Sequence, residues 1–319
     1  MSTFLVTGPT GVVGNYLTHL LLERGHQVRA FAHRIDDRSQ RLAAAGAEVV
    51  VGDLLDLAAV RAATDGVDGA YFSYPITPGL VEATTIFAQA ASEAGAEIIV
   101  NMSQKPARPD AGSNASRQHW LSERIFNNFP VPAAHIKPTF FAEWLIQFLD
   151  ADNTLRLPFE DARHAPIAGV DQAAVVAGIL EHPQNHDGKE YPLYGPVELN
   201  HFQIAETLTD TLGVQFSYEP VSIEAFADTA RGQGFDEHVV QHIENVAQDY
   251  RDGIFAGTND VIQTIGNKTP TTVADFAVHN KDYLVDKKSW GTGAQHRTND
   301  RDSKSRRSLP VLDHPRSHR

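Results

Sequence analysis

The chain has 319 residues and a formal net charge of −13, and this acidic balance argues against nucleic-acid binding, which needs clustered Lys and Arg. Cysteine is absent, which excludes disulfides, thiolate nucleophiles and Cys-ligated zinc or iron–sulfur clusters. No cationic leader precedes the first apolar run, and no run approaches the roughly 20 apolar residues of a membrane span. We therefore expect a cytoplasmic protein with neither nucleic-acid nor membrane partners.

The first structural signal is a glycine-rich turn between an apolar run and an amphipathic segment. The run Phe4–Thr7 leads into Gly8-Pro-Thr-Gly11-Val-Val-Gly14, and apolar residues at helical spacing follow. In such a strand–turn–helix unit the first glycine permits the tight turn, the second lets the backbone approach phosphates, and the third lets helix and strand pack closely. The helix N-terminus adds unpaired N–H groups and a partial positive charge. The segment therefore predicts a site for the pyrophosphate of a dinucleotide.

Strand-like and helix-like segments then alternate through about the first 140 residues, which is typical of a parallel sheet covered by helices on both faces. The expected strands are continuous Val/Ile-rich runs, as in buried parallel sheets. They are Val28–Ala32, Glu48–Val51, Gly69–Ser73, Ile98–Met102 and Ala134–Lys137. The expected helices are Asp37–Ala45, Leu57–Thr64, Leu80–Ala94 and Ser116–Asn128. We assign residues 1–150 to an α/β domain of the Rossmann type, with a doubly wound parallel sheet.

The pattern changes near Asp150, where helical stretches begin to enclose only short strands. The helices are Asp171–Glu181, His201–Leu212, Ile223–Arg231, Asp236–Tyr250 and Val273–Val278, and the strands are Glu190–Tyr194 and Gln215–Glu219. We expect residues 151–285 to form a smaller, mostly helical lobe on the C-terminal side of the sheet, partly interleaved with it. Residues 286–319 are polar, with nine Lys+Arg against four Asp+Glu, and we expect them to form a disordered tail.

The residue twenty positions after the last glycine bears on which dinucleotide is bound. An acidic residue at about that place usually binds the ribose 2′-OH of NAD, whereas this chain has Arg34, preceded by His33. A guanidinium suits a 2′-phosphate through its charge and its forked donors. Asp36 and Asp37 lie close by and would repel a phosphate, and Arg34 could instead begin a solvated helix. We expect NADP and keep NAD as the alternative.

Several segments resemble the NmrA-like family, a branch of the atypical short-chain dehydrogenase/reductases. They are the glycine motif, His33-Arg34, Gly52-Asp53, Asn101-Met-Ser-Gln104, Arg117-Gln-His-Trp120 with Glu123, Lys137-Pro-Thr-Phe-Phe-Ala-Glu143, Asp171-Gln-Ala, and Gly195-Pro196 with the helix Ile204–Leu212. The resemblance covers nearly all of residues 1–285. It implies a Rossmann domain that binds NADP(H) and a small C-terminal lobe that closes a cleft, with no flavin or metal expected.

The same resemblance implies a set of cofactor contacts. Gly8, Gly11 and Gly14 would hold the pyrophosphate, and Arg34 would hold the 2′-phosphate. Asp53 and Leu54 would contact the adenine, Ser73 and Pro75 would line the nicotinamide side, and Lys137 and Pro138 would lie near the carboxamide. Thr10, Val13 and His33 complete the expected set of cofactor contacts. The turn at Lys137–Thr139 would close that side of the pocket.

Catalysis in short-chain dehydrogenases normally needs a Tyr-x-x-x-Lys pair on one helix face, in which the lysine lowers the tyrosine pKa. This chain has no tyrosine between Tyr74 and Tyr191. At the expected place, sixteen residues after Ser103, stands His119, and Glu123 follows four residues later. The glutamate could orient the imidazole, which would then donate a proton near neutral pH. His119 could equally be a buried structural group or a contact to the ribose.

Aromatic residues at helical spacing follow the last strand of the first domain. They are Phe140, Phe141, Trp144 and Phe148. Core packing between the two lobes is the stronger interpretation. Alternatively, Phe141 or Trp144 walls a flat apolar pocket above the nicotinamide, with Tyr74 in a second wall. Such a pocket suits quinones or azo dyes, which accept hydride without a tuned phenol donor.

Two functions are compatible with these features. The first is an NADPH-dependent reductase of quinone-like, azo or related electrophilic acceptors by direct hydride transfer, in which His119 donates the proton and Ser103 contacts the acceptor. The second is a non-catalytic redox sensor that binds the dinucleotide and controls a protein partner, as the loss of the Tyr/Lys pair would predict. A nucleotide-sugar epimerase is disfavoured because it relies on the same missing tyrosine.

Overall fold

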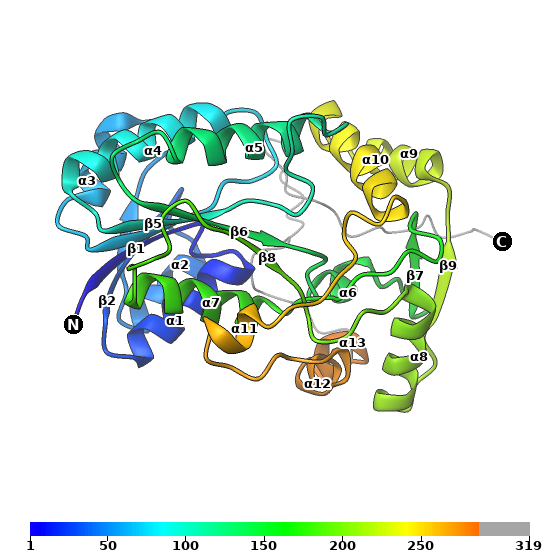
Figure 1. Cartoon of the computed structure of the whole chain (residues 1–319). Coiled ribbons are helices and arrows are strands. Elements are labelled where there is room, and N and C mark those ends of the chain that lie inside the picture. Colours follow the sequence, from blue (N-terminus) through cyan, green and yellow to red (C-terminus); the bar gives the residue numbers. More distant parts are fainter. Residues whose placement is uncertain (287–319) are drawn as a thin grey trace.

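The structure is a computed structural model of the chain, and it describes residues 1–286. The tail expected at 286–319 lies outside the described residues, apart from Asp286. Figure 1 shows a larger part, in which a sheet lies between two layers of helices, and a smaller, mostly helical part beside it. In the described part of the chain, no helix is long and apolar enough to cross a membrane.

The larger part is built on a sheet of seven parallel strands in the order β3-β2-β1-β4-β5-β6-β8. They are β1 (Thr3–Thr7), β2 (Gln27–Ala32), β3 (Glu48–Val51), β4 (Gly69–Phe72), β5 (Ile98–Met102), β6 (Ala133–Pro138) and β8 (Glu190–Leu193). The chain winds outward from β1 in both directions, so the strand order reverses between β1 and β4. Ligands of open α/β sheets bind outside the carboxyl ends of the strands at that reversal. The predicted doubly wound sheet is confirmed, and the glycine-rich turn lies at its switch point.

Helices cover both faces of this sheet (Figure 1). On one face are α1 (Val12–Glu23), α2 (Asp37–Ala44) and α7 (Gly169–Glu181), and on the other are α3 (Leu57–Thr64), α4 (Leu80–Ala94) and α5 (Asn114–Phe126). In β5, Ile98 and Val100 pack on the α1–α7 side, whereas Ile99 packs on the α4–α5 side. Because both faces are buried, the strands need the continuous Val and Ile runs that the sequence shows.

The smaller lobe has its own core. It contains α6 (Trp144–Phe148), β7 (Thr154–Leu157), α8 (His201–Leu212), β9 (Ser217–Pro220), α9 (Ile223–Gly232), α10 (Glu237–Arg251), α12 (Val273–His279) and α13 (Lys281–Leu284). β7 and β9 pair in parallel as a separate two-stranded sheet. Aromatic rings fill much of the core, where Tyr250 and Phe255 stack with ring centroids 3.8 Å apart. The short helix α11 (Val261–Thr264) packs beside α7 instead.

Two elements that the sequence placed in the smaller lobe belong to the larger part. Helix α7 is buried on nearly all sides and packs against α1, and strand β8 pairs with β6 at the edge of the large sheet. The chain therefore leaves the sheet after β6, returns for α7 and β8, and leaves it again. The four-residue strand β7 was not predicted.

Candidate functional site

The turn after β1 has a backbone geometry suited to a pyrophosphate. Gly8 has a φ of +57°, in the left-handed region that favours glycine, and its carbonyl accepts the N–H of Gly11 at 3.0 Å. Gly11 is the N-cap of α1 and makes no side-chain capping hydrogen bond, so the first N–H groups of that helix are not capped by this residue. A Cβ on Gly14 would lie 2.3 Å from the Gly8 oxygen. These features fit a bound pyrophosphate.

The neighbours of the turn contribute in different ways. Thr10 is half-buried on the turn, whereas the Val13 side chain is buried in the core between α1 and the sheet. Ser73 follows β4, and a Cβ on Gly8 would lie 3.6 Å from the Ser73 Cβ. The Ser73 N–H donates to Thr7 Oγ1 at 2.8 Å. This hydrogen bond ties together the ends of β1 and β4, the two strands at the switch point.

The predicted 2′-phosphate contacts lie at the end of β2. His33 and Arg34 are exposed, and 72% of the Arg34 side chain is accessible. Its Nε lies 3.8 Å from Asp36 Oδ2. Asp36 also caps α2 and accepts the Arg38 guanidinium at 2.6 Å. Burial raises the pKa of Asp36, but the hydrogen bonds from Arg38 and the helix backbone outweigh it and the pKa falls below its usual value. The ionised Asp36 is engaged mainly by Arg38 and the helix backbone, and the exposed Arg34 guanidinium remains accessible to a phosphate.

The predicted adenine contacts follow β3, the strand that pairs with β2. The Asp53 carboxylate accepts the N–H of Leu55 at 2.9 Å and so closes the turn that leads to α3. Leu54 packs partly against the core beneath α3 and α4. The structure therefore places Asp53 and Leu54 at the same edge of the sheet as Arg34, one strand further from the glycine-rich turn.

A buried polar cluster lies at the carboxyl ends of β5 and β6. Ser103 follows β5, Lys137 belongs to β6, and Glu123 projects from α5, which covers them. The Ser103 hydroxyl donates to Glu123 Oε1 at 2.5 Å, and Lys137 Nζ lies 3.2 Å from the same oxygen. The Lys137 ammonium, expected near the nicotinamide carboxamide, is thus engaged by Glu123. Pro138, the last residue of β6, is buried beside it.

The cluster continues to the surface through Glu190 of β8. Lys137 Nζ donates to Glu190 Oε2 at 3.0 Å, Arg124 donates to Glu190 Oε1 at 2.7 Å, and 40% of the Glu190 side chain is exposed. Burial raises the pKa of Glu123, against the hydrogen bonds from Ser103 and Lys137. Burial acts on Glu190 in the same direction, but its bonds with Lys137 and Arg124 prevail and its pKa is lowered. One hydrogen-bonded chain therefore joins two carboxyl groups whose pKa values are moved apart.

His119 lies on α5 one turn before Glu123, but the two side chains do not form the expected pair. The Glu123 carboxylate bonds to Ser103 and Lys137, and the buried Nδ1 of His119 has no hydrogen-bond partner. Burial, with His242 and Lys137 nearby, lowers the pKa of His119 to about 3. An imidazole with that pKa is uncharged at neutral pH. The structure therefore does not contain the imidazolium donor, oriented by Glu123, that the sequence suggested.

The aromatic candidates occupy two different environments. Phe141 and Trp144 are half-buried and stack with ring centroids 5.0 Å apart and 10° between their planes. Phe140 is fully buried in the core of the smaller lobe and packs edge-on against Trp144. Tyr74 is buried in the core on the α4 side and donates to a backbone carbonyl at 3.2 Å, so it does not form the second wall of a pocket. Pro75, the next residue, is exposed.

Glu143 was not among the predicted site residues, although it ends the segment at 137–143 that resembles the family. Its Oε1 accepts the N–H of Gly169 at 2.8 Å, and its buried Oε2 has no partner. Burial raises the pKa of Glu143 to about 7. A Cβ on Gly169 would lie 2.4 Å from Val12 and 3.0 Å from Glu143, so this carboxyl lies beside the first turn of α1. Only the fold brings them together, and no local signal in the sequence could have shown it.

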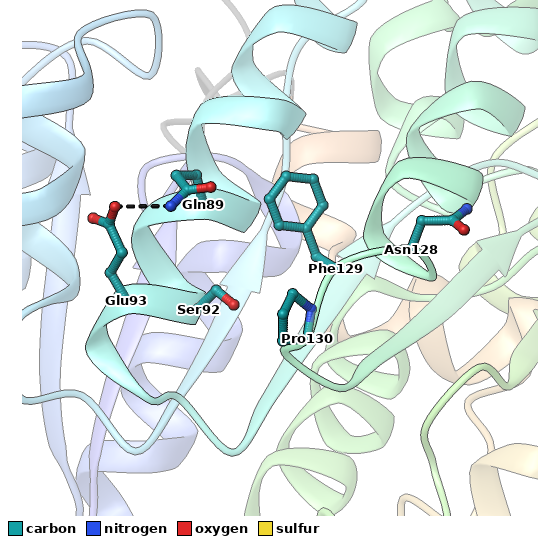
Figure 2. A pocket seen from close by; sticks show the side chains of 6 residues that line it. All are labelled: Gln89, Ser92, Glu93, Asn128, Phe129 and Pro130. Carbon is teal, nitrogen blue, oxygen red and sulfur yellow. Dashed lines mark hydrogen bonds between the residues drawn. The ribbon is translucent and has the colours of Figure 1, made fainter.

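A surface pocket lies away from this edge of the sheet. Figure 2 shows it between the C-terminal ends of α4 and α5, lined by Gln89, Ser92, Glu93, Asn128, Phe129 and Pro130. Helices that connect parallel strands run antiparallel to them, so this pocket lies at the edge opposite the glycine-rich turn. None of the predicted site residues lines it. Within residues 1–286, no group of three or more His, Asp or Glu side chains is placed to hold a metal ion.

The fold and the turn define a Rossmann-type protein built to hold a dinucleotide at its switch point. The NmrA-like family model matches residues 1–277, and the chain belongs to that family. The resemblance inferred from the sequence is therefore confirmed.

Individual relatives are distant but span most of the chain. The chain is 26% identical over 278 residues to an NAD(P)H azoreductase of Xenophilus azovorans, covering 86% of this chain and 96% of that relative. The crystal structure of NADPH-dependent quinone oxidoreductase QOR2 from Escherichia coli, complexed with NADPH, has a TM-score of 0.75 at 22% identity and covers 86% of this chain and 99% of its own. NmrA, a negative transcriptional regulator in complex with NADP, has a TM-score of 0.68 at 16% identity, covering 91% and 93%. These structural likenesses show the shared fold.

Proposed function

We propose that this protein is an NADPH-dependent reductase that transfers hydride directly to quinone-like, azo or related electrophilic acceptors. The observation that carries the proposal is the juxtaposition, at one edge of the sheet, of an open glycine-rich turn and the buried cluster of Ser103, Glu123 and Lys137. The first is suited to a dinucleotide, and the second offers polar chemistry where ligands of such sheets bind. The azoreductase that aligns with 86% of this chain supports the same class of activity.

Some residues of the chain would bind the dinucleotide, and others would position the acceptor. Gly8, Gly11 and Gly14 would hold the pyrophosphate with the N–H groups of α1, and Arg34 would bind the 2′-phosphate. When bound, the reduced nicotinamide supplies the hydride. The stacked rings of Phe141 and Trp144 offer a flat apolar surface against which a planar acceptor can be oriented and shielded from water.

The test follows the consumption of NADPH by purified protein against a panel of quinones, azo dyes and aldehydes. Fluorescence titration of NADPH and NADH runs alongside and shows whether the site is filled. We expect turnover with quinones or azo dyes and none with aldehydes, which need a tuned donor for the alkoxide. Tight dinucleotide binding without turnover on any acceptor would contradict the reductase. Failure of both dinucleotides to bind would contradict the site itself.

One observation favours a second function. The Tyr-x-x-x-Lys pair is absent, and His119 and Glu123 stand in its place. A redox sensor needs the dinucleotide site but no catalytic pair, and the regulator NmrA shares this fold. Such a sensor would bind NADP⁺ and NADPH with different affinities and would bind a protein partner in only one of these states. Titration of both forms, followed by a partner-binding assay at saturating dinucleotide, separates this function from a reductase.

A further inference from the structure

A hydroxyl, a buried carboxyl and an ammonium form one hydrogen-bonded chain at the carboxyl ends of β5 and β6. We propose that Ser103 delivers the proton to the reduced acceptor, and that Glu123, held by Lys137, resupplies it. The proposal rests on the reductase function above and assigns its proton path. It replaces the missing tyrosine with a relay drawn from three elements of the fold.

Ser103 is the member of this chain that lies nearest, along the sheet, to the glycine-rich turn, and its side chain is buried. It is the first residue after β5, and β5 pairs with β4, which leads into Ser73 beside the glycine-rich turn. Its Oγ is hydrogen-bonded to Glu123 Oε1 at 2.5 Å, so a proton can pass between these two oxygens along an existing hydrogen bond. The other candidate, His119, is uncharged at neutral pH because it is buried.

Glu123 is suited to store the proton. It is fully buried, and burial disfavours its charged form. Charged groups lie close to it on three elements: Arg124 on α5, Lys137 on β6 and Glu190 on β8. The two cations stabilise the carboxylate that forms when the proton leaves, whereas burial favours its return.

Hydride transfer to a quinone leaves an anionic oxygen on the acceptor. That oxygen takes the proton of Ser103 as Ser103 takes the proton of the Glu123 carboxyl, so an O–H bond forms on the acceptor and the negative charge ends on Glu123. Glu123 then regains a proton from water in one concerted shift, in which the Lys137 ammonium passes a proton to Glu123 as it takes another by way of Glu190, which is 3.0 Å from its Nζ and 40% exposed. The net change is one proton moved from solvent to the acceptor.

A cationic triphenylmethane dye is a matched acceptor that needs no relay, because hydride adds to its positive central carbon and no proton is taken up. Ser103→Ala and Glu123→Gln are expected to lower kcat for a quinone by about a hundredfold, the usual contribution of a general acid. The same variants are expected to reduce the dye at the wild-type rate. Ser103→Thr keeps the hydroxyl and should retain quinone turnover.

Ser122→Ala is the matched control. Ser122 is a second buried hydroxyl on α5, next to Glu123 in sequence, and it bonds to Thr84 at 2.9 Å rather than to the relay. We expect this variant to reduce both acceptors normally. NADPH affinity, measured by fluorescence titration, should be unchanged in all four variants.

Infrared spectroscopy tests, without any turnover, whether Glu123 carries a proton. The infrared difference spectrum of cofactor-free wild type minus Glu123→Gln should contain a protonated-carboxyl band near neutral pH. Absence of that band, equal slowing of quinone and dye reduction, or normal quinone reduction by Ser103→Ala would each overturn the relay while leaving the reductase intact. Failure of the wild type to reduce either acceptor would overturn the reductase, and the relay with it.

Discussion

A Cβ on Gly14 would stand 2.3 Å from the carbonyl oxygen of Gly8 and 2.9 Å from its carbonyl carbon. The backbone of Gly14, in α1, therefore packs directly against the backbone of Gly8, in the turn after β1. A flexible side chain could move aside, but a carbonyl held by the adjoining strand cannot. This contact keeps the N-terminus of α1, with its uncapped N–H groups and partial positive charge, at the switch point of the sheet.

Gly14→Ala is therefore expected to weaken NADPH binding by at least about tenfold, or about 1.4 kcal/mol, because the turn must open to admit the methyl group. Fluorescence titration measures the effect. The control is Gly232→Ala, since a Cβ on Gly232 at the end of α9 meets nothing within 4 Å. Equal affinity in the two variants would mean that the dinucleotide does not use this turn.

Arg34 should decide the choice between the two dinucleotides. Its guanidinium is exposed and 3.8 Å from Asp36, which the α2 backbone and Arg38 already engage. Arg34→Ser should weaken NADPH binding by about 1.5–3 kcal/mol, the usual loss for a hydrogen bond to a charged group, and leave NADH binding unchanged. The ratio of the two dissociation constants, measured on the same preparation, corrects for any general damage. A ratio equal to that of the wild type would place the 2′-phosphate elsewhere.

The strands of the sheet could be predicted because their signal is local. β1, β2 and β5 are short apolar runs that end at a glycine or a polar residue, and the order of elements implies parallel pairing. Contacts between elements that are far apart in the sequence leave no such local signal. Helix α7 is apolar on nearly all sides, which predicts burial but not that α1 covers it. The helix itself was predicted correctly, and the sequence indicated that residues 151–285 interleave with the sheet but not that α7 is the helix that returns to it.

In the candidate site, too, one part could be predicted from local sequence and another part could not. The glycine-rich turn is contiguous in sequence, so its geometry could be derived from three glycines. The pairing of Glu123 was not predictable by the helical i, i+4 rule, which pointed to His119. Because β6 lies beneath α5, the Lys137 ammonium is 3.2 Å from Glu123, and this partner comes from a strand that the helical spacing does not reveal.

Asp171, at the start of α7, forms an ion pair and hydrogen bonds with the loop that precedes α12. Its fully buried carboxylate accepts Lys268 Nζ at 2.6 Å, the Thr271 N–H at 2.7 Å and the Thr271 hydroxyl at 2.8 Å. Lys268→Met would leave a buried charge without its counter-ion, and we expect a loss of about 3–5 kcal/mol in the free energy of unfolding. Arg231→Met is the control, because its ion pairs lie on the surface, where water screens them and they contribute little to stability. Urea unfolding compares the two, and similar losses would contradict a special role for the buried pair.

The stability of the smaller lobe should depend on pH through its buried histidines. His164 and His201 lie in the aromatic core with ring centroids 4.8 Å apart, and none of their four ring nitrogens has a hydrogen-bond partner. Burial lowers the pKa of His164 from 6.5 to about 3, and that of His201 also falls well below 6.5, through burial and the nearby His164. The unfolded chain therefore binds protons between pH 6.5 and 3 that the folded chain does not. Stability is complete above pH 6.5 and falls as the pH drops, by about 1.4 kcal/mol per pH unit for each such histidine.

His164→Phe removes one of these rings and keeps an aromatic group of similar size in an apolar site. Across the same pH range, we expect the variant to lose about 1.4 kcal/mol per pH unit less than the wild type, and to be at least as stable at neutral pH, because two unpartnered polar atoms are gone. Urea unfolding at a series of pH values measures both effects. His182→Gln, at an exposed position, serves as the control and should leave the slope unchanged. A slope in His164→Phe equal to that of the wild type would mean that the folded protein protonates His164 as readily as the unfolded chain does.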